Sequence, residues 1–339
     1  MNDHNELVPI KPQAAVEKYL THRQNEEVSK KTLQAHKYRL NHFVRWCQQE
    51  EIESLTEISP RDLQDYRHWR KKDGGLNNVS WHTQMITFRV FVKWAENYQA
   101  LPPEMHKRIE IPQLKQNEDA RDKTFSEERT ADILQYLKRY DYASNLHTLF
   151  AILWHTGMRV GSARAIDLRD FNEQEQYIEL VHRPETGTAL KNGANGERPV
   201  SLANPETQLL ADYIENVRSE VTDSEGRKPL FTTSNGRAHR TTLRSWIYKL
   251  ARPCTYAECP HDRDPDSCEA ARRVDEASKC PSSFSPHTIR RSSITHWLSQ
   301  DAPMEAVSDR MNAEEEALEK HYDKRTEKGK MEQRKEYFR

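Results

Sequence analysis

Residues 149–159 have the sequence LFAILWHTGMR, which decides the fold of the second half of the chain. Leu149 to Trp154 is the longest apolar run in the protein, and it predicts a buried helix over 146–158. The run is far too short to cross a bilayer, so we expect a cytoplasmic protein without membrane spans. The helix ends at Thr156-Gly157-Met158-Arg159, and a charge that complements the helix dipole is one interpretation of Arg159.

The segments on either side of this helix predict two domains, which suits a chain of 339 residues. Apolar residues recur at helical spacing over 13–100, and Pro102, Pro103 and Pro112 then indicate a linker. Short strands are predicted at 177–182 and 198–202, and helices at 204–221 and 241–251. The predicted fold class is therefore mostly α with a small β-sheet. The predicted divisions are a tail at 1–12, a helical domain at 13–113, a linker at 114–123, an α+β domain at 124–325 and a charged arm at 326–339.

The charge of the chain restricts its function only weakly. The protein has 52 Lys and Arg against 53 Asp and Glu, whereas DNA-binding proteins usually carry a basic excess. What matters is whether the basic residues gather on one face. Two helical stretches are rich in them: Lys30, Lys31, His36, Lys37 and Arg39, and then Arg67, His68, Trp69, Arg70, Lys71 and Lys72. Contact with phosphates is one interpretation of these stretches, and a solvated helix face is the other.

Three further motifs follow TGMR along the chain. They are LKNG at 190–193, between the predicted strands, HTIR at 287–290, at the start of a helix, and KHYD at 320–323. In this order the four motifs resemble those of the tyrosine recombinases, or phage integrase family, of the Xer-like, archaeal type. The resemblance covers about 13–325. It implies a SAM-like core-binding domain and an α+β integrase catalytic domain that close around double-stranded DNA as a C-shaped clamp.

The resemblance implies a site-specific DNA recombinase that cleaves and rejoins DNA through a 3′-phosphotyrosyl intermediate, without a cofactor. The implied catalytic residues are Arg159, Lys191, His287, Arg290 and Tyr322. In this scheme Tyr322 attacks phosphorus and Lys191 protonates the departing 5′ oxygen. The residue types suit the chemistry, because a phenol with a pKa of about 10 needs a strongly positive site to attack. Guanidinium groups hold phosphate oxygens through rigid forks of donors. The charged arm is implied to dock on a neighbour in a homotetramer on DNA.

Two positions depart from the family pattern. Ala313 stands where His or Trp is usual, and Ser162 replaces an acidic residue. Because the side chain of Ala313 cannot donate a hydrogen bond, a catalytically inactive DNA-binding protein with an integrase fold is an alternative. A type IB topoisomerase-like enzyme is another, since it shares the same catalytic residue types.

Individual residues also have local alternatives. Arg198 lies close to Lys191 in the sequence and is a second candidate for its role. Tyr337, in the charged arm, is the rival nucleophile to Tyr322. Arg291, next to the HTIR motif, is expected at the surface or on a phosphate.

Four of the five cysteines gather in a polar insertion at 253–283. They are Cys254, Cys259, Cys268 and Cys280, separated by four, eight and eleven residues, with His261 among them. Four thiolates can hold zinc in a tetrahedral site, although the CxxC pairs typical of such sites are absent. A loop of this length with almost no apolar residues needs something to staple it. Structural zinc is therefore predicted, and free cysteines or disulfides are the alternatives.

Overall fold

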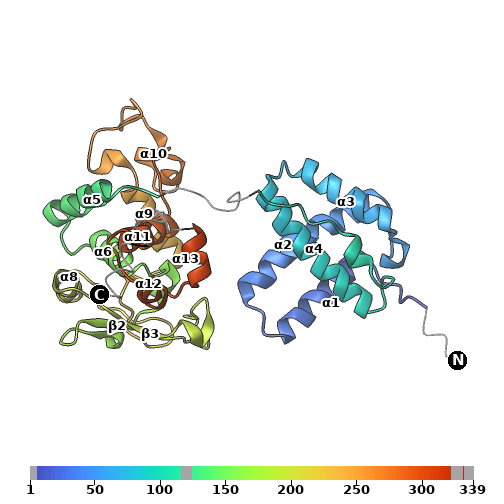
Figure 1. Ribbon diagram of the computed structural model, residues 1–339, viewed down its shortest axis with the longest axis horizontal. Helices are drawn as coiled ribbons and strands as arrows, with labels where there is room; N and C mark the ends of the chain where they lie inside the picture. The colour runs from blue at the N-terminus through green and yellow to red at the C-terminus, as the bar shows by residue number, and fades with distance from the viewer. Residues whose placement is uncertain (1–5, 116–123, 322–330, 332–339) are drawn as a thin grey trace. The chain divides into compact units, whose positions relative to one another are not determined.

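The computed structural model describes residues 6–115, 124–321 and 331. The chain divides into two compact units, Met1–Arg121 and Asp122–Arg339, each with its own hydrophobic core (Figure 1). In the part of the chain that the structure describes, no helix is long and apolar enough to span a membrane.

The first unit is a helical bundle, as the spacing of its apolar residues predicts. Over 6–115 its elements are α1 (Pro12–Asn25), α2 (Lys30–Gln49), η1 (Leu55–Glu57), α3 (Pro60–Asp73), α4 (Asn78–Asn97) and η2 (Met105–Arg108). The side chains of Ser29, Ser59 and Asn77 accept hydrogen bonds from backbone N–H groups and so begin α2, α3 and α4. Aromatic side chains fill the core between these helices: Tyr19, Phe43, Tyr66, Phe88 and Phe91.

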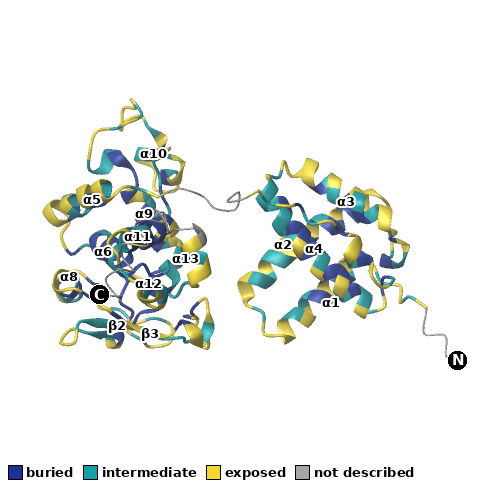
Figure 2. Cartoon of the chain, in the orientation of Figure 1, coloured by how far each residue is buried: buried dark blue, intermediate teal, exposed yellow. Residues whose placement is uncertain are grey.

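The second unit packs helices around one central helix, α6 (Asn145–Thr156). The other described helices are α5 (Glu127–Tyr140), α7 (Val160–Ala165), η3 (Leu168–Asp170), η4 (Gly193–Gly196), α8 (Asn204–Asn216), α9 (Arg240–Leu250), η5 (Pro253–Thr255), α10 (Glu269–Arg272), η6 (Ala277–Lys279), α11 (Pro286–Ser299), α12 (Met304–Met311) and α13 (Glu315–His321). As predicted, α6 is buried, and α5, α8, α9 and α11 pack against it (Figure 2). The apolar run at 149–154 is therefore the centre of this core.

Two small antiparallel sheets accompany these helices. In the first, the strands β1 (Phe171–Asn172), β2 (Tyr177–Leu180) and β3 (Arg198–Ser201) pair in that order. In the second, β4 (Thr232–Thr233) pairs with β5 (Gly236–Arg237). Ile178 faces Val200 across β2 and β3, and both side chains are buried in the core. The long connection between β2 and β3 carries the LKNG motif, in which Leu190 is buried in the core and Lys191 is exposed.

Buried ion pairs fix the sheet to the segment after α7. Asp170 holds Arg183, which follows β2, with an Oδ1–Nη2 distance of 2.6 Å. Asp167, 1% exposed, lies between Arg183 and Arg237 and pairs with both. Asp223 also pairs with Arg237, with an Oδ2–Nη2 distance of 2.9 Å. These contacts tie the base of the β2–β3 connection to the helix that follows Arg159.

Candidate active site

Arg159 lies at the turn between α6 and α7. Gly157 ends α6 with φ of +61°, in the left-handed region that glycine adopts most readily. A Cβ atom at this position would also lie 2.5 Å from Sδ of Met311, so a side chain does not fit there. Arg159 then begins α7, and its Nη1 donates to Oδ1 of Asn312 at 3.3 Å. The TGMR sequence thus presents this guanidinium beside the end of α12.

Arg290 comes to the same place from α11. Its side chain is 3% exposed, and Nη1 donates to the backbone oxygens of Gly157 at 2.8 Å and Met311 at 2.6 Å. Nη2 lies 3.4 Å from the backbone oxygen of Asn312. Because these carbonyls belong to the ends of α6 and α12, the guanidinium joins three helices and has little freedom to move.

Lys191 is exposed on the connection between β2 and β3. Two neighbours attach this segment to the end of α12: Nδ2 of Asn192 donates to Oδ1 of Asn312 at 2.6 Å, and Nδ2 of Asn312 donates to the backbone oxygen of Asn195 at 2.8 Å. Leu190 N donates to Nδ1 of His182 at 2.9 Å, which fixes the other side of the lysine. The loop is therefore held against the end of α12, which also contacts Arg159 and Arg290.

His287 stands in the first turn of α11, which begins with a capping box between Ser285 and Thr288. Burial of the ring lowers the pKa of His287, and the positive charges of Arg290, Arg291, Arg159 and Lys191 lower it further. The imidazole therefore lies in a positively charged environment.

Arg159, Arg290 and the segment next to Lys191 thus meet at Asn312, and His287 lies one turn before Arg290 on α11. A positive site of this kind attracts and orients a phosphate. Tyr322 and its rival Tyr337 lie outside the described residues. The described backbone reaches His321 at the end of α13. Leu318 of that helix is buried against α11 and α12.

Asn312 is a residue whose place in the site the sequence did not indicate. It ends α12 with φ of 50° and ψ of 63°, and asparagine tolerates this left-handed conformation better than most residues. Its side chain links Arg159 to the Lys191 loop, while its backbone oxygen faces Arg290. The sequence signal was present only as the departure at Met311-Asn312-Ala313. Ala313 itself contributes a backbone oxygen, which accepts from Oγ of Ser308 at 2.7 Å.

Two other arginines, Arg198 and Arg291, lie near the motifs in sequence, the first half-buried and the second buried. Arg198 donates through Nε to the backbone oxygen of Arg310 and through Nη1 to that of Gly196, both at 2.8 Å. Burial lowers the pKa of Arg198 to about 10, with further lowering by Arg159 and Arg310. The expected surface position of Arg291 is wrong: its side chain is 6% exposed, because α11 crosses the interior of the unit (Figure 2).

In the helical unit, the basic stretches divide into internal and exposed residues. Arg70 is 3% exposed and donates to Oε1 of Gln84 at 2.8 Å, while Arg39 donates to Oγ1 of Thr87 at 2.9 Å. The exposed members are Lys30, Lys31, Lys37, His68, Lys71 and Lys72. These are the side chains of the two stretches that can meet a phosphate.

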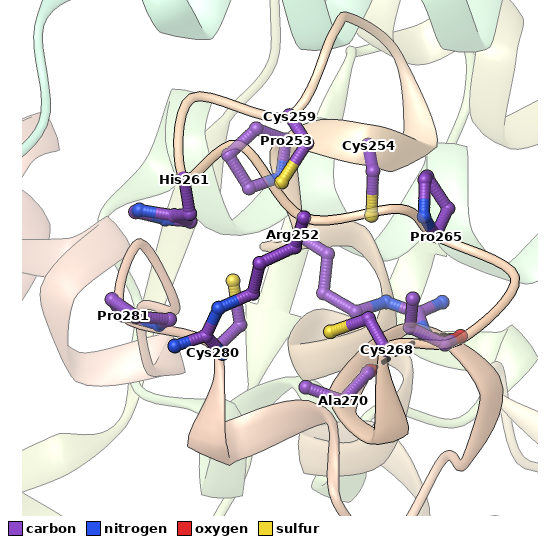
Figure 3. A pocket seen from close by; sticks show the side chains of 12 residues that line it. Arg252, Pro253, Cys254, Cys259, His261, Pro265, Cys268, Ala270, Cys280 and Pro281 are labelled. Atoms are coloured by element: carbon purple, nitrogen blue, oxygen red, sulfur yellow. Dashed lines mark hydrogen bonds between the residues drawn. The ribbon is translucent and has the colours of Figure 1, made fainter.

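The four cysteines of the insertion line a small cavity together with Arg252 and His261 (Figure 3). Within the described ranges, no group of three or more His, Cys, Asp or Glu side chains is gathered closely enough to hold a metal ion. All four thiols are free and half-buried. The predicted zinc site is therefore not formed by the side chains in their present positions.

Comparison with known proteins gives related sequences over most of the chain. Residues 16–99 match the phage integrase N-terminal SAM-like domain. The tyrosine recombinase XerD of Staphylococcus haemolyticus is 24% identical over 302 residues, which cover 87% of this chain and 88% of that protein. XerD of Staphylococcus epidermidis is 23% identical over 307 residues, with the same coverage of 87% and 88%.

Solved structures with the same fold include two integrases bound to DNA. The Tn1549 transposon integrase in complex with a circular intermediate DNA has a TM-score of 0.67 at 14% identity, covering 96% of this chain and 99% of that one. A lambda integrase dimer bound to a COC′ core site has a TM-score of 0.61 at 12% identity, covering 93% and 77%. At these identities the likeness is one of fold, and it agrees with the predicted combination of a helical domain and an α+β domain.

Proposed function

The chain belongs to the tyrosine recombinase family, and from this premise we propose that Arg159, Lys191, His287 and Arg290 bind the scissile phosphate that Tyr322 attacks. The protein is a site-specific DNA recombinase, an enzyme that works by transesterification. The observation that supports the site assignment is that Arg159, Arg290 and the segment next to Lys191 all contact Asn312. Four cationic or ionisable groups from three distant segments meet at one place.

The proposed reaction exchanges one phosphoester bond for another. The phenol oxygen of Tyr322 attacks phosphorus and gives its proton to the neutral imidazole of His287, whose pKa is lowered. The bond to the 5′ oxygen breaks in the same step, and Lys191 gives a proton to that oxygen. Arg159 and Arg290 hold the nonbridging oxygens as negative charge develops, and one such donor typically contributes about 2.7–4 kcal/mol. The 3′-phosphotyrosine then keeps the energy of the bond, so a free 5′ hydroxyl of a partner strand reverses the step.

The transesterification requires no cofactor, as in tyrosine recombinases generally. The predicted zinc belongs to a different place, the four cysteines of the insertion. It takes no part in the transfer of the phosphoryl group.

Double-stranded DNA at specific sites is the proposed partner, with a homotetramer of the chain assembled on it and acting in the cytoplasm. The charged arm at 326–339, which lies outside the described residues, is the proposed contact between neighbours. The proposed seat for the arm is a hollow between α12 and the end of β3, where Trp297, Leu202 and Val307 are apolar and His155 and Arg310 are polar. The archaeal affinity of the sequence remains a prediction from the motifs.

A nicked DNA substrate tests the proposal, because cleavage near the nick releases a short fragment and traps the covalent intermediate. We expect a protein–DNA adduct with the intact protein, none with Tyr322→Phe and an undiminished amount with Tyr337→Phe, the matched control. The adduct is measured on denaturing gels.

Other outcomes of the same experiment identify the alternatives. DNA binding with no adduct from the intact protein would indicate an inactive binder with an integrase fold. An adduct, together with relaxation of a supercoiled plasmid without site preference in a separate assay, would indicate a topoisomerase-like enzyme. If Tyr337→Phe loses the adduct and Tyr322→Phe keeps it, the nucleophile is Tyr337 of the charged arm.

A further inference from the structure

The insertion between α9 and α11 has almost no hydrophobic core of its own. From Cys254 to Ser283, the buried apolar side chains are Ala270 and Ala277. Burying an alanine removes little apolar surface from water, whereas ordering each residue costs about 1–2 kcal/mol of backbone entropy. Two short turns, α10 and η6, pack on each other and η6 packs on α9. The apolar contacts of the segment do not explain how some thirty residues keep one conformation.

The two ends of the insertion, by contrast, are firmly anchored by one residue of α5. Arg129 donates through Nε to the hydroxyl of Tyr256 at 2.7 Å and through Nη2 to the backbone oxygen of Ser282 at 3.1 Å. Its guanidinium also lies 5.0 Å from the centre of the Phe284 ring. The entry and exit of the insertion are thus fixed side by side, and what lies between them must be closed from within.

The four thiols are the groups placed to close it. Figure 3 shows the sulfur atoms of Cys254, Cys259, Cys268 and Cys280 directed into the space between them, from four different turns of the backbone. They line one small cavity, although they are separated by as many as 26 positions in sequence. No disulfide joins them. In the same view the ring of His261 extends away from the sulfurs, and its Nε2 lies 2.9 Å from Oγ of Ser282.

We propose that these four thiolates bind one zinc ion, and that the ion closes the insertion on the start of α11 and so positions His287 and Arg290. Zinc accepts four cysteine ligands in a tetrahedral arrangement with Zn–S distances of about 2.3 Å. In their present positions the described thiols are not close enough to hold a metal ion, so binding requires them to move inward. Arg252 lines the same cavity and donates to the backbone oxygen of Ala270 at 3.0 Å (Figure 3). Its positive charge offsets the excess negative charge of four thiolates around one divalent ion.

The position of the insertion gives the ion its effect. Cys280 is seven residues before His287, and the chain between them contains Ser282, held by Arg129, and the buried Phe284. Phe284 stacks on Phe125 with ring centres 4.5 Å apart, next to the core that α11 crosses. A bond between Cys280 and the zinc ion therefore restrains the segment that leads directly into α11. The proposal of a zinc site depends only on the four cysteines. The proposal that zinc affects DNA cleavage also depends on the proposed function.

Metal content and cobalt spectroscopy test the site without reference to activity. We expect one zinc per chain in the purified full-length protein, measured by native mass spectrometry and elemental analysis. After removal of the zinc, Co²⁺ should give the thiolate charge-transfer band and the intense visible bands of a tetrahedral site, and Zn²⁺ should abolish both. Cys259→Ser and Cys280→Ser should each lose the metal, while Cys47→Ala in the other unit and His261→Gln should keep it. Retention in every cysteine variant, a disulfide, or four free thiols without metal would each overturn the proposal.

Hydrogen exchange and the nicked DNA substrate test the effect on α11. Removing zinc should speed amide exchange over 285–291 and leave the helical unit unchanged, and it should lower adduct formation by up to about 100-fold. Normal metal binding together with no adduct from the intact, zinc-loaded protein would leave the zinc site standing and reject the recombinase assignment. Full cleavage activity and unchanged exchange without zinc would refute the positioning role alone.

Discussion

At the scale of single residues, Asn312 holds the parts of the site together. Its amide accepts from Arg159 and Asn192 and donates to the backbone of Asn195, so it connects the first arginine with the lysine loop. The usual His or Trp is missing one position later, at Ala313. We infer that Asn312 is a positioning residue for the phosphate-binding groups and does not itself need to touch the phosphate.

Substitutions at Asn312 separate positioning from binding. Asn312→Gly keeps the left-handed turn but removes the amide, so we expect about 10–100-fold slower adduct formation with nearly unchanged DNA affinity, as the loss of a hydrogen bond to a charged group suggests. Asn312→Asp places a carboxylate beside Arg159 that competes with the phosphate, so DNA binding should weaken as well. Single-turnover cleavage and equilibrium binding measure the two effects. Wild-type cleavage by Asn312→Gly would show that the amide is dispensable.

The sequence predicts the position of Arg159 at the end of an apolar helix, but it does not predict the contacts of Asn312. The difference lies in how far along the chain the two residues make their contacts. The turn that presents Arg159 is coded locally by Thr156 to Arg159 after an apolar helix. Asn312 acts on residues 120 and 153 positions away, and no local spacing records such pairs. The burial of Arg291 escaped prediction for the same reason, because a polar helix sequence gives no sign that other helices surround it.

At the scale of elements, the buried ion pairs of Asp167 and Asp170 fix the start of the β2–β3 connection, which carries Lys191. Arg183 follows β2, and Arg227 reaches both Asp167 and the hydroxyl of Thr188, which it contacts at 3.0 Å. The network therefore joins the segment after α7 to the β2–β3 connection. Because Arg159 precedes α7 and Lys191 lies on that connection, the same buried ion pairs help to fix the positions of both residues.

Removing one charge from this network should destabilise the second unit strongly. Asp167→Asn leaves buried guanidinium groups without their counter-charge, which typically costs about 3–5 kcal/mol in the free energy of unfolding. Urea denaturation followed by tryptophan fluorescence measures the loss, with the exposed Glu173→Gln as a control expected within about 0.5 kcal/mol of the parent. A change of less than about 1 kcal/mol in Asp167→Asn would mean that the unit does not depend on this carboxylate.

Elements that extend over several turns or residues were predictable, whereas the shortest were not. The two strands that carry a burial pattern, β2 and β3, lie within the predicted 177–182 and 198–202. β1, β4 and β5 have two residues each, too few for any alternation to appear. The helix predicted over 204–221 ends at Asn216, because Arg218 turns inward and donates to the backbone oxygen of Pro229 at 2.8 Å.

At the scale of the whole molecule, a net charge of −1 has to be reconciled with a polyanionic partner. Some acidic residues of the second unit, such as Asp167, are buried in ion pairs and are not at the surface. The lysines of α2 and α3, by contrast, are exposed. Affinity for DNA depends on such local clusters more than on the sum of charges, because the phosphate backbone releases counterions only where cations meet it.

The salt dependence of binding identifies which of these lysines meet phosphates. Each lysine–phosphate contact contributes about 0.9 to the slope of log affinity against log salt concentration, so Lys37→Gln and Lys72→Gln should each lower the slope by nearly that amount. Lys107→Gln is the matched control, because its ammonium already pairs with Glu104 and should leave the slope unchanged. Fluorescence anisotropy over a salt series measures all three. If both test variants keep the parent slope, the basic stretches are solvated helix faces, and the grip on DNA must come from the second unit and from other residues of the first.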